Sequence, residues 1–145
     1  MILGISQPTF FPWIGYFAFL DKIDKIIFLD DVQFEKRSWQ QRNYIKLNGQ
    51  KHFITIPVKS KDRYDQKILD VEILSKKYLD LIKKKIFYSY KKSSYFDVYY
   101  KSICEILDKN FYYLSELNIE LIKYFIDILK IKIDLGYSSD YSLTL

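Results

Sequence analysis

The first thirty residues combine two short apolar runs with one longer apolar segment. Met1–Ser6 and Lys25–Leu29 are runs of the kind that form buried strands. Between them, Ile14–Ile23 is apolar nearly all round, which predicts a short buried helix. Gln7–Trp13 contains two prolines and should be a shaped loop, because proline disfavours helical backbone in the residue before it. The spacing therefore predicts a parallel βαβ unit.

The following segment has the pattern of a hairpin. Tyr44–Leu47 and His52–Val58 flank Asn48-Gly49, the strongest short signal for a two-residue turn. The charged segment Lys59–Lys67 should be a loop. Ile68–Leu74 then alternates between apolar and polar residues with an imperfect phase, and this favours one more strand.

From residue 75 onward the apolar spacing becomes helical. Three successive segments repeat apolar residues at steps of three and four, which predicts three amphipathic helices. Ser75 and Ser115 are the candidate N-caps of the first and third helix. Ile131–Leu135 should return to the sheet as a strand, and Gly136–Leu145 should end the chain without a closing element.

These elements predict an α/β fold with a parallel βαβ core, a β-hairpin and a three-helix carboxy-terminal subdomain. A chain of 145 residues is long enough for one domain with its own core. We expect a single domain over 1–145, with a β-rich, motif-bearing part at 1–74, a helical part at 75–130, and a terminal strand and tail at 131–145.

Charge and cysteine content narrow the functional classes. The net charge is +5, yet residues 1–35 carry two lysines against five acidic residues and are therefore negative. The lysines elsewhere are interleaved with acids, which indicates a solvated surface more than a nucleic-acid site. A single cysteine excludes an internal disulfide and thiolate metal sites. With no signal-peptide pattern and no apolar run of about 20 residues, we expect a cytoplasmic protein.

Two polar and aromatic motifs follow the two predicted parallel strands. The first is QPTFFPWIGYF, at Gln7–Phe17, and the second is FLDDVQFEKRSW, at Phe28–Trp39, with Arg42-Asn43 after it. Ligands of open parallel sheets bind beyond the carboxyl ends of the strands, so both motifs should line one site. Its candidate catalytic residues are Asp31 and Gln7. Its candidate substrate-binding residues are Phe11, Trp13, Tyr16, Asp30, Gln33, Lys36, Arg37, Trp39, Arg42 and Asn43.

The chemistry of these side chains suits sugars and nucleotides, because aromatic walls combine with a few fixed polar groups. Structural roles compete with this interpretation. Gln7 and Asp31 could satisfy backbone groups at turns, and Arg37 and Arg42 could pair with the aspartates to hold the loop. The remaining candidates are weak: His52 lies on a hairpin strand without a nucleophile motif, and Cys104 lies on the apolar side of a helix. No cluster of His, Asp and Glu has the spacing of a metal site.

The two motifs resemble the WbqC-like family from the first strand to Pro57-Val58, and more loosely to about Ser139. This resemblance implies a protein of O-antigen or other surface-polysaccharide gene clusters, in a family where some members are suggested to transfer glycine onto an amino sugar. Family members continue further, through a Ser-Gly-Pro-Gly-type motif and a His-Gly segment that this sequence lacks. We therefore expect a truncated member or a fragment.

A second, fold-level resemblance is to pantothenate synthetase and other HUP-type nucleotidyltransferases. Their His-x-Gly-His motif, which contacts ATP phosphates, corresponds here to Trp13-Ile14-Gly15-Tyr16. Neither histidine is present, so the resemblance implies a related fold and not adenylate chemistry.

The sequence thus predicts a sugar-modifying protein of O-antigen or capsule biosynthesis. Its activity would be aminoacyl (glycine) or acyl transfer to an amino-sugar nucleotide, with Asp31 taking the amine proton. The acyl donor and any cofactor are unknown. The alternatives are a non-catalytic or partial family member that binds a nucleotide-sugar or a partner subunit, and a nucleic-acid binder. We expect a sugar or nucleotide-sugar ligand, no nucleic acid, and either a homo-oligomer or a partner polypeptide that completes the site.

Overall fold

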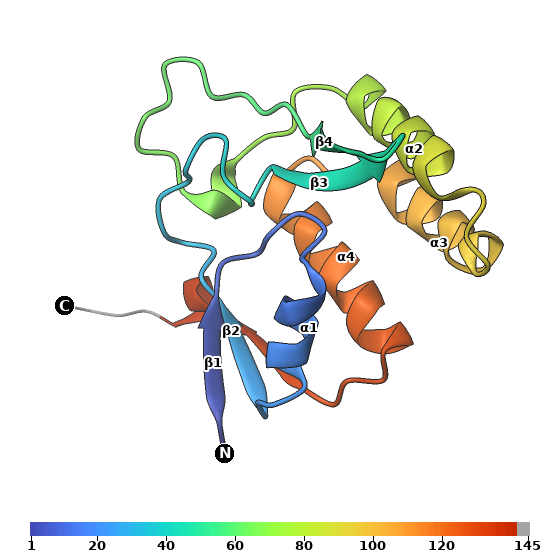
Figure 1. The fold of residues 1–145 in the computed structure, drawn as a ribbon. Coiled ribbons are helices and arrows are strands. Elements are labelled where there is room, and N and C mark those ends of the chain that lie inside the picture. The colour runs from blue at the N-terminus through green and yellow to red at the C-terminus, as the bar shows by residue number, and fades with distance from the viewer. Residues whose placement is uncertain (142–145) are drawn as a thin grey trace.

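The structure is a computed structural model that describes residues 1–141. Nine principal helices and strands lie in the described part of the chain, and Figure 1 shows how they are arranged. In chain order they are β1 (Leu3–Ser6), α1 (Ile14–Leu20), β2 (Lys25–Phe28), β3 (Arg42–Leu47), β4 (Gln50–Thr55), α2 (Lys77–Tyr90), α3 (Phe96–Asp108), α4 (Leu114–Ile128) and β5 (Asp134–Tyr137). Short 3-10 turns, η1 and η2, lie at Ile68–Asp70 and Ser138–Asp140. The predicted α/β class, with its hairpin and three carboxy-terminal helices, is confirmed.

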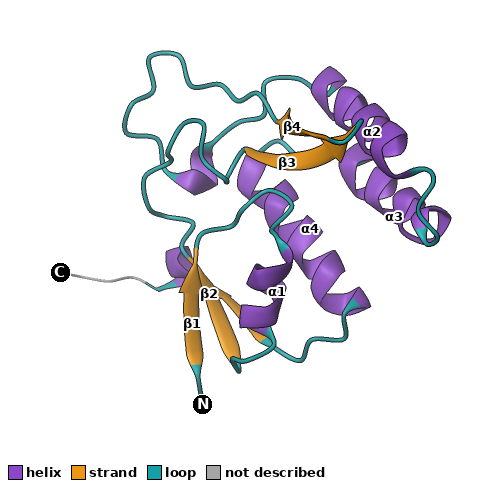
Figure 2. Ribbon diagram, viewed as in Figure 1, coloured by secondary structure: helices purple, strands orange, loops and turns teal. Residues whose placement is uncertain are grey.

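A three-stranded parallel sheet forms the first layer. Strand β2 is central and pairs in parallel with both β1 and β5, so the predicted pairing of the first two strands is confirmed. Figure 2 shows α1 and α4 on the same side of this sheet. The apolar side chains between these layers form one core cluster, whose buried members are Phe17, Leu20, Ile23, Ile26, Phe28, Ile122 and Ile126.

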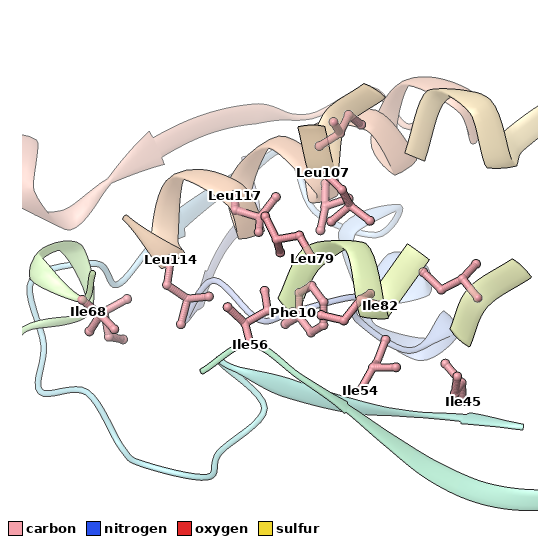
Figure 3. Close-up of a cluster of buried hydrophobic side chains, with 14 of the residues drawn as sticks. Phe10, Ile45, Ile54, Ile56, Ile68, Leu79, Ile82, Leu107, Leu114 and Leu117 are labelled. Atoms are coloured by element: carbon pink, nitrogen blue, oxygen red, sulfur yellow. The ribbon is translucent and has the colours of Figure 1, made fainter. Parts of the chain in front are cut away.

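The hairpin β3–β4 carries the second core cluster. Asn48 and Gly49 both have positive φ, 51° and 78°, as the two-residue turn of a twisted hairpin requires. The inward-facing Ile45 and Ile54 extend from the hairpin toward Ile82 of α2 (Figure 3). Burial of such a side chain contributes about 1.5–3 kcal/mol, so this layer holds the hairpin against the helices.

Helix α4 joins the two clusters. Its Leu114, Leu117 and Leu121 are buried in the hairpin cluster, whereas Ile122 and Ile126 are buried against the sheet. The three-helix part therefore shares its core with the β-rich part, and the two motifs are held over one continuous interior.

The predicted strand at Ile68–Leu74 is wrong. The segment instead begins with the 3-10 turn η1, which starts at the buried Ile68 and is followed by the buried Val71. It continues as isolated bridges of Ile73 to Val58 and of Glu72 to Tyr113. Burial of two side chains three residues apart favours a turn over a strand, which would place them on opposite faces.

The two predicted serine caps are also wrong. Helix α2 has Lys76 at its N-cap, without a side-chain hydrogen bond. Ser115 lies inside α4, where the N-cap is Tyr113 and the backbone N–H of Leu114 donates to Val71 O at 2.8 Å. At α4, this tertiary contact and the Glu116 carboxylate, which accepts a hydrogen bond from Tyr113 N–H at 3.3 Å, take the place of a serine cap.

The last strand is shifted along the chain. It lies at Asp134–Tyr137 and not at Ile131–Leu135, because Ile131 and Ile133 pack against the sheet cluster before the pairing begins. Of the predicted tail, residues 138–140 form the turn η2, and residues 142–145 lie outside the described part.

Candidate functional site

A cleft of about 400 Å³ lies between the first motif and the start of the hairpin. Four aromatic side chains dominate its walls. We call it the aromatic cleft, and the side chains that line it are Thr9, Pro12, Trp13, Tyr16, Trp39, Asn43 and Tyr44. Four predicted site residues, Trp13, Tyr16, Trp39 and Asn43, are thus brought together from both motifs.

Asn43 fixes the loop that forms one wall of the cleft. Its Nδ2 donates to the carbonyls of Phe10, at 3.2 Å, and Phe11, at 2.7 Å. Phe11 has φ 46°, a left-handed conformation that non-glycine residues rarely adopt and that needs such support. The Phe10 N–H also donates to Trp39 O at 2.8 Å, which ties the two motifs together. The Phe11 ring then packs against Phe125 of α4, with centroids 6.2 Å apart.

The two tryptophans of the chain expose large surfaces in the cleft. The side chain of Trp13 is 72% exposed and that of Trp39 is 53% exposed. The Trp13 indole lies over Gly15, where a Cβ would come within 2.0 Å of the ring, so the absence of a side chain there sets its position. Trp39 packs edge-on against Tyr44, with centroids 5.8 Å apart. Exposed aromatic surface of this kind makes the cleft the candidate binding site.

Tyr16 also lines the cleft. Its hydroxyl is buried and has no hydrogen-bond partner within residues 1–141. Burial raises the pKa of Tyr16 to about 12, and the interaction with the Ser6 hydroxyl partly opposes this shift. The hydroxyl therefore stays neutral at neutral pH, and a buried hydroxyl without a partner is energetically costly.

The aspartates of the second motif lie at the carboxyl end of the sheet. Asp30 is buried and accepts hydrogen bonds from Ser139 N at 3.0 Å and Ser139 Oγ at 2.7 Å. Asp31 is half-buried and accepts a hydrogen bond from the Ser138 hydroxyl. These bonds connect the end of β2 to the turn after β5, a partner that the sequence did not indicate.

Gln7 belongs to a buried amide network between the two motifs. Its Oε1 accepts a hydrogen bond from Gln40 Nε2 at 2.8 Å. Asn118 of α4, fully buried, donates from Nδ2 to the carbonyls of Gln40, at 2.7 Å, and Pro8, at 3.1 Å. Gln41 accepts from Arg37 N–H at 3.0 Å. Sequence reasoning missed Gln40, Gln41 and Asn118, although a lone amide on an apolar helix face was a usable signal for the last.

The remaining predicted residues make contacts away from the cleft. Gln33 Nε2 donates to Tyr64 O at 3.0 Å, and the Lys36 ammonium lies 5.2 Å from the Tyr64 ring centre. Arg42 lies over the Phe53 ring at 4.4 Å, and the Arg37 side chain is exposed. Among the ion pairs of residues 1–141, neither arginine pairs with Asp30 or Asp31, so the alternative of a loop-holding salt bridge is not seen.

The histidine, metal and membrane features give no further candidate site over the described residues. The only histidine of the chain, His52, is exposed on the hairpin. In the described part of the chain, no three His, Cys, Asp or Glu side chains are grouped so that they could hold a metal ion. Within residues 1–141, every helix is too short or too polar to cross a membrane.

Comparison with known proteins places both motifs in one family. The sequence profile of the WbqC-like protein family matches residues 7–144. The chain is 32% identical over 142 residues to an uncharacterised protein of Mycobacterium tuberculosis, Rv1507c. That match covers 97% of this chain but only 62% of the relative's length. No solved structure shows significant similarity. The chain therefore belongs to the WbqC-like protein family.

Proposed function

We propose that the aromatic cleft binds a sugar or nucleotide-sugar in the biosynthesis of a surface polysaccharide. The observation that carries this proposal is the pair of exposed indoles, Trp13 and Trp39, which line one cleft. Family membership supports the polysaccharide context.

The cleft offers the contacts that a sugar ring needs. The apolar face of a pyranose, or a nucleotide base, can stack on Trp13, Trp39 or Tyr44. Asn43 is already bonded to the carbonyls of Phe10 and Phe11, so it shapes the cleft and leaves recognition to its neighbours.

Tryptophan fluorescence tests this proposal directly, because both tryptophans of the chain line the cleft. Titration with UDP-N-acetylglucosamine, UDP-glucose and free UDP should shift the emission and show which part is recognised. We expect Trp13→Ala to weaken binding about threefold to tenfold, the loss of one aromatic contact. Tyr88→Ala, an exposed aromatic on α2 outside the cleft, is the matched control. No emission shift with any of these ligands would refute the proposal.

The finer proposal is transfer of an aminoacyl (glycine) or acyl group from an activated acyl donor to an amino-sugar nucleotide. The sugar nitrogen would form an amide bond to the acyl carbon as the bond from that carbon to the donor's leaving group breaks. Asp31 would accept the amine proton, and Gln7 would orient the substrate. The contacts of the two aspartates support this choice: Asp30 is buried and bonded to Ser139, whereas Asp31 is half-buried and retains an oxygen for a substrate. Gln7 already accepts from Gln40, which leaves its Nε2 as the group for a ligand.

The proton-acceptor role is testable in a longer, active relative. Changing the residue equivalent to Asp31 to Asn should lower turnover about a hundred- to ten-thousand-fold, the usual contribution of a general base. In the present chain, Asp31→Asn should leave nucleotide-sugar binding nearly unchanged. Near-normal turnover of a well-folded variant would remove Asp31 from the mechanism.

The alternative is a non-catalytic or partial family member that binds a nucleotide-sugar and a partner. Apolar side chains exposed on the edge strand β1, at Leu3 and Ile5, favour self-association, because edge strands with such side chains readily pair. Ile5→Lys should then shift the sedimentation behaviour toward the monomer. A wild-type chain that sediments as a monomer at all concentrations would contradict this.

A further inference from the structure

The aromatic cleft continues into a second, longer depression, which we call the apolar groove. Its first segment, of about 410 Å³, shares Pro12, Trp13, Asn43 and Tyr44 with the cleft. A second segment, of about 210 Å³, shares Ile86, Tyr90 and Ile103 with the first. The groove thus runs from the cleft, past the hairpin, to the space between α2 and α3.

The side chains of the groove are uncharged and mostly apolar. Among residues 1–141, no charged side chain lines either segment. Beyond the residues shared with the cleft, the polar side-chain groups described there are the Ser93 hydroxyl and the hydroxyls of four tyrosines, including Tyr90, whose Oη already accepts from Lys46 N–H at 3.4 Å. The lining residues beyond the cleft are Phe11, Ile45, Ile54, Ile86, Tyr90, Ser93, Tyr95, Phe96, Tyr99, Tyr100, Ile103 and Phe125.

We propose that the apolar groove holds the hydrocarbon chain of an amphiphilic ligand whose sugar head occupies the aromatic cleft. This inference rests on the proposed function and adds the ligand class: a sugar joined to a lipid or acyl chain. The continuity of the two depressions through Trp13 supports one ligand over two. A head stacked on Trp13 would direct its substituent along Ile45 and Ile86 toward Tyr99.

The polarity of the groove favours a hydrocarbon over a polypeptide. A bound peptide would carry amide groups into the groove, and each buried amide without a partner costs several kcal/mol. The groove offers few partners for them. A methylene chain has no such groups, and its burial against isoleucine and aromatic side chains is favourable along its whole length.

The test is a titration with n-alkyl β-D-glucosides of one, six, eight and ten carbons, below their micellar concentrations, followed by tryptophan emission. Each methylene that enters the groove should tighten binding about twofold to fourfold. Tyr90→Glu places a charge where the two segments meet and should abolish this chain-length dependence while methyl glucoside still binds. Tyr88→Glu, on the same helix but outside the groove, is the matched control and should change neither.

The outcomes separate this inference from the proposed function. If methyl glucoside or the nucleotide-sugars bind but longer chains bring no gain, the amphiphile is excluded and the sugar site stands. A gain that persists in Tyr90→Glu would assign the chain to another surface and overturn the inference. If n-octanol binds as tightly as octyl glucoside and no nucleotide-sugar binds, the head contributes nothing, and both proposals fall.

Discussion

The aromatic cleft and the carboxyl end of the sheet receive side chains from the same two motifs but differ in how those side chains are satisfied. At the sheet end, Asp30 and Asp31 are bonded to the Ser138-Ser139 turn. In the cleft, Trp13 and Trp39 are largely exposed and the Tyr16 hydroxyl is unpartnered.

This difference separates structural from functional roles better than residue type does. A carboxylate that already accepts several hydrogen bonds can form few new ones with a ligand. Replacing it lowers the stability of the protein. An exposed indole or an unpartnered buried hydroxyl has contacts still to make. The hydrogen bonds at the sheet end are therefore mainly structural, and the exposed indoles support the proposal that the cleft binds a ligand, with Asp31 as the proposed proton acceptor.

The largest effect on stability should come from removing the Asn118 side chain, which bonds to the first motif and to the residue that follows the second. Asn118→Leu deprives the carbonyls of Pro8 and Gln40 of their donor. Two buried acceptors left unpaired should cost about 2–4 kcal/mol in the free energy of unfolding. Urea denaturation measures this, with the exposed α4 variant Asp127→Ala as control. Equal stability of the two variants would show that the amide network does not hold the motifs.

Replacing Asp30 should lower the free energy of unfolding more than replacing Asp31. Asp30→Asn replaces an acceptor that binds Ser139 through both N–H and Oγ, and should lower the free energy of unfolding by about 1–3 kcal/mol. Asp31→Asn loses part of one bond to a half-buried group and should cost less than about 1 kcal/mol. Asp140→Asn, in the same turn but exposed, is the control. A larger loss for Asp31 would reverse the assignment of the structural residue.

In the cleft, a change that adds one methyl group should affect binding more than stability. Gly15→Ala places a carbon where the Trp13 indole lies, so the ring must move. We expect an altered near-ultraviolet circular dichroism spectrum and several-fold weaker nucleotide-sugar binding. The free energy of unfolding should be unchanged or slightly higher, because alanine favours helix. The control Ala18→Ser, exposed on the same helix, should change neither the spectrum nor the affinity. Unchanged affinity with a displaced indole would remove Trp13 from the site.

The smallest effect concerns the loop that borders the second motif. The Glu72 carboxylate accepts from Lys59, Tyr112 and Arg63, and these bonds lower its pKa to about 2. A lowered folded-state pKa stabilises the fold above the ordinary carboxyl pKa, and this contribution is lost as pH falls toward 2. The melting temperatures of wild type and Glu72→Gln should therefore differ at pH 7 and converge only as the pH falls from about 4 toward 2. A pH-independent difference would point to packing instead.

The local parts of the fold followed from the sequence. The apolar runs at Met1–Ser6 and Lys25–Leu29, the Asn48-Gly49 turn and the helical periods each express a rule that acts over a few residues. For the same reason, the parallel pairing of the first two strands was predictable: a short crossover helix permits little else. Of the aromatic residues proposed for the site, Trp13, Tyr16 and Trp39 line the cleft, whereas the Phe11 ring packs against Phe125.

Only the tertiary structure decided which polar residues of the motifs are bonded within the protein and which are left free. Whether Asp30 meets a ligand or Ser139 depends on β5, more than a hundred residues away in the chain. Asn118 likewise reaches Pro8 across the interior, and Val71 O takes the place of a cap at α4. Hydrophobic periodicity records which face of an element is buried, but a hydrogen bond depends on where two distant segments come to lie. The sequence determined the elements and the motifs, and the packing of α4 and β5 determined which motif residues remain free to bind.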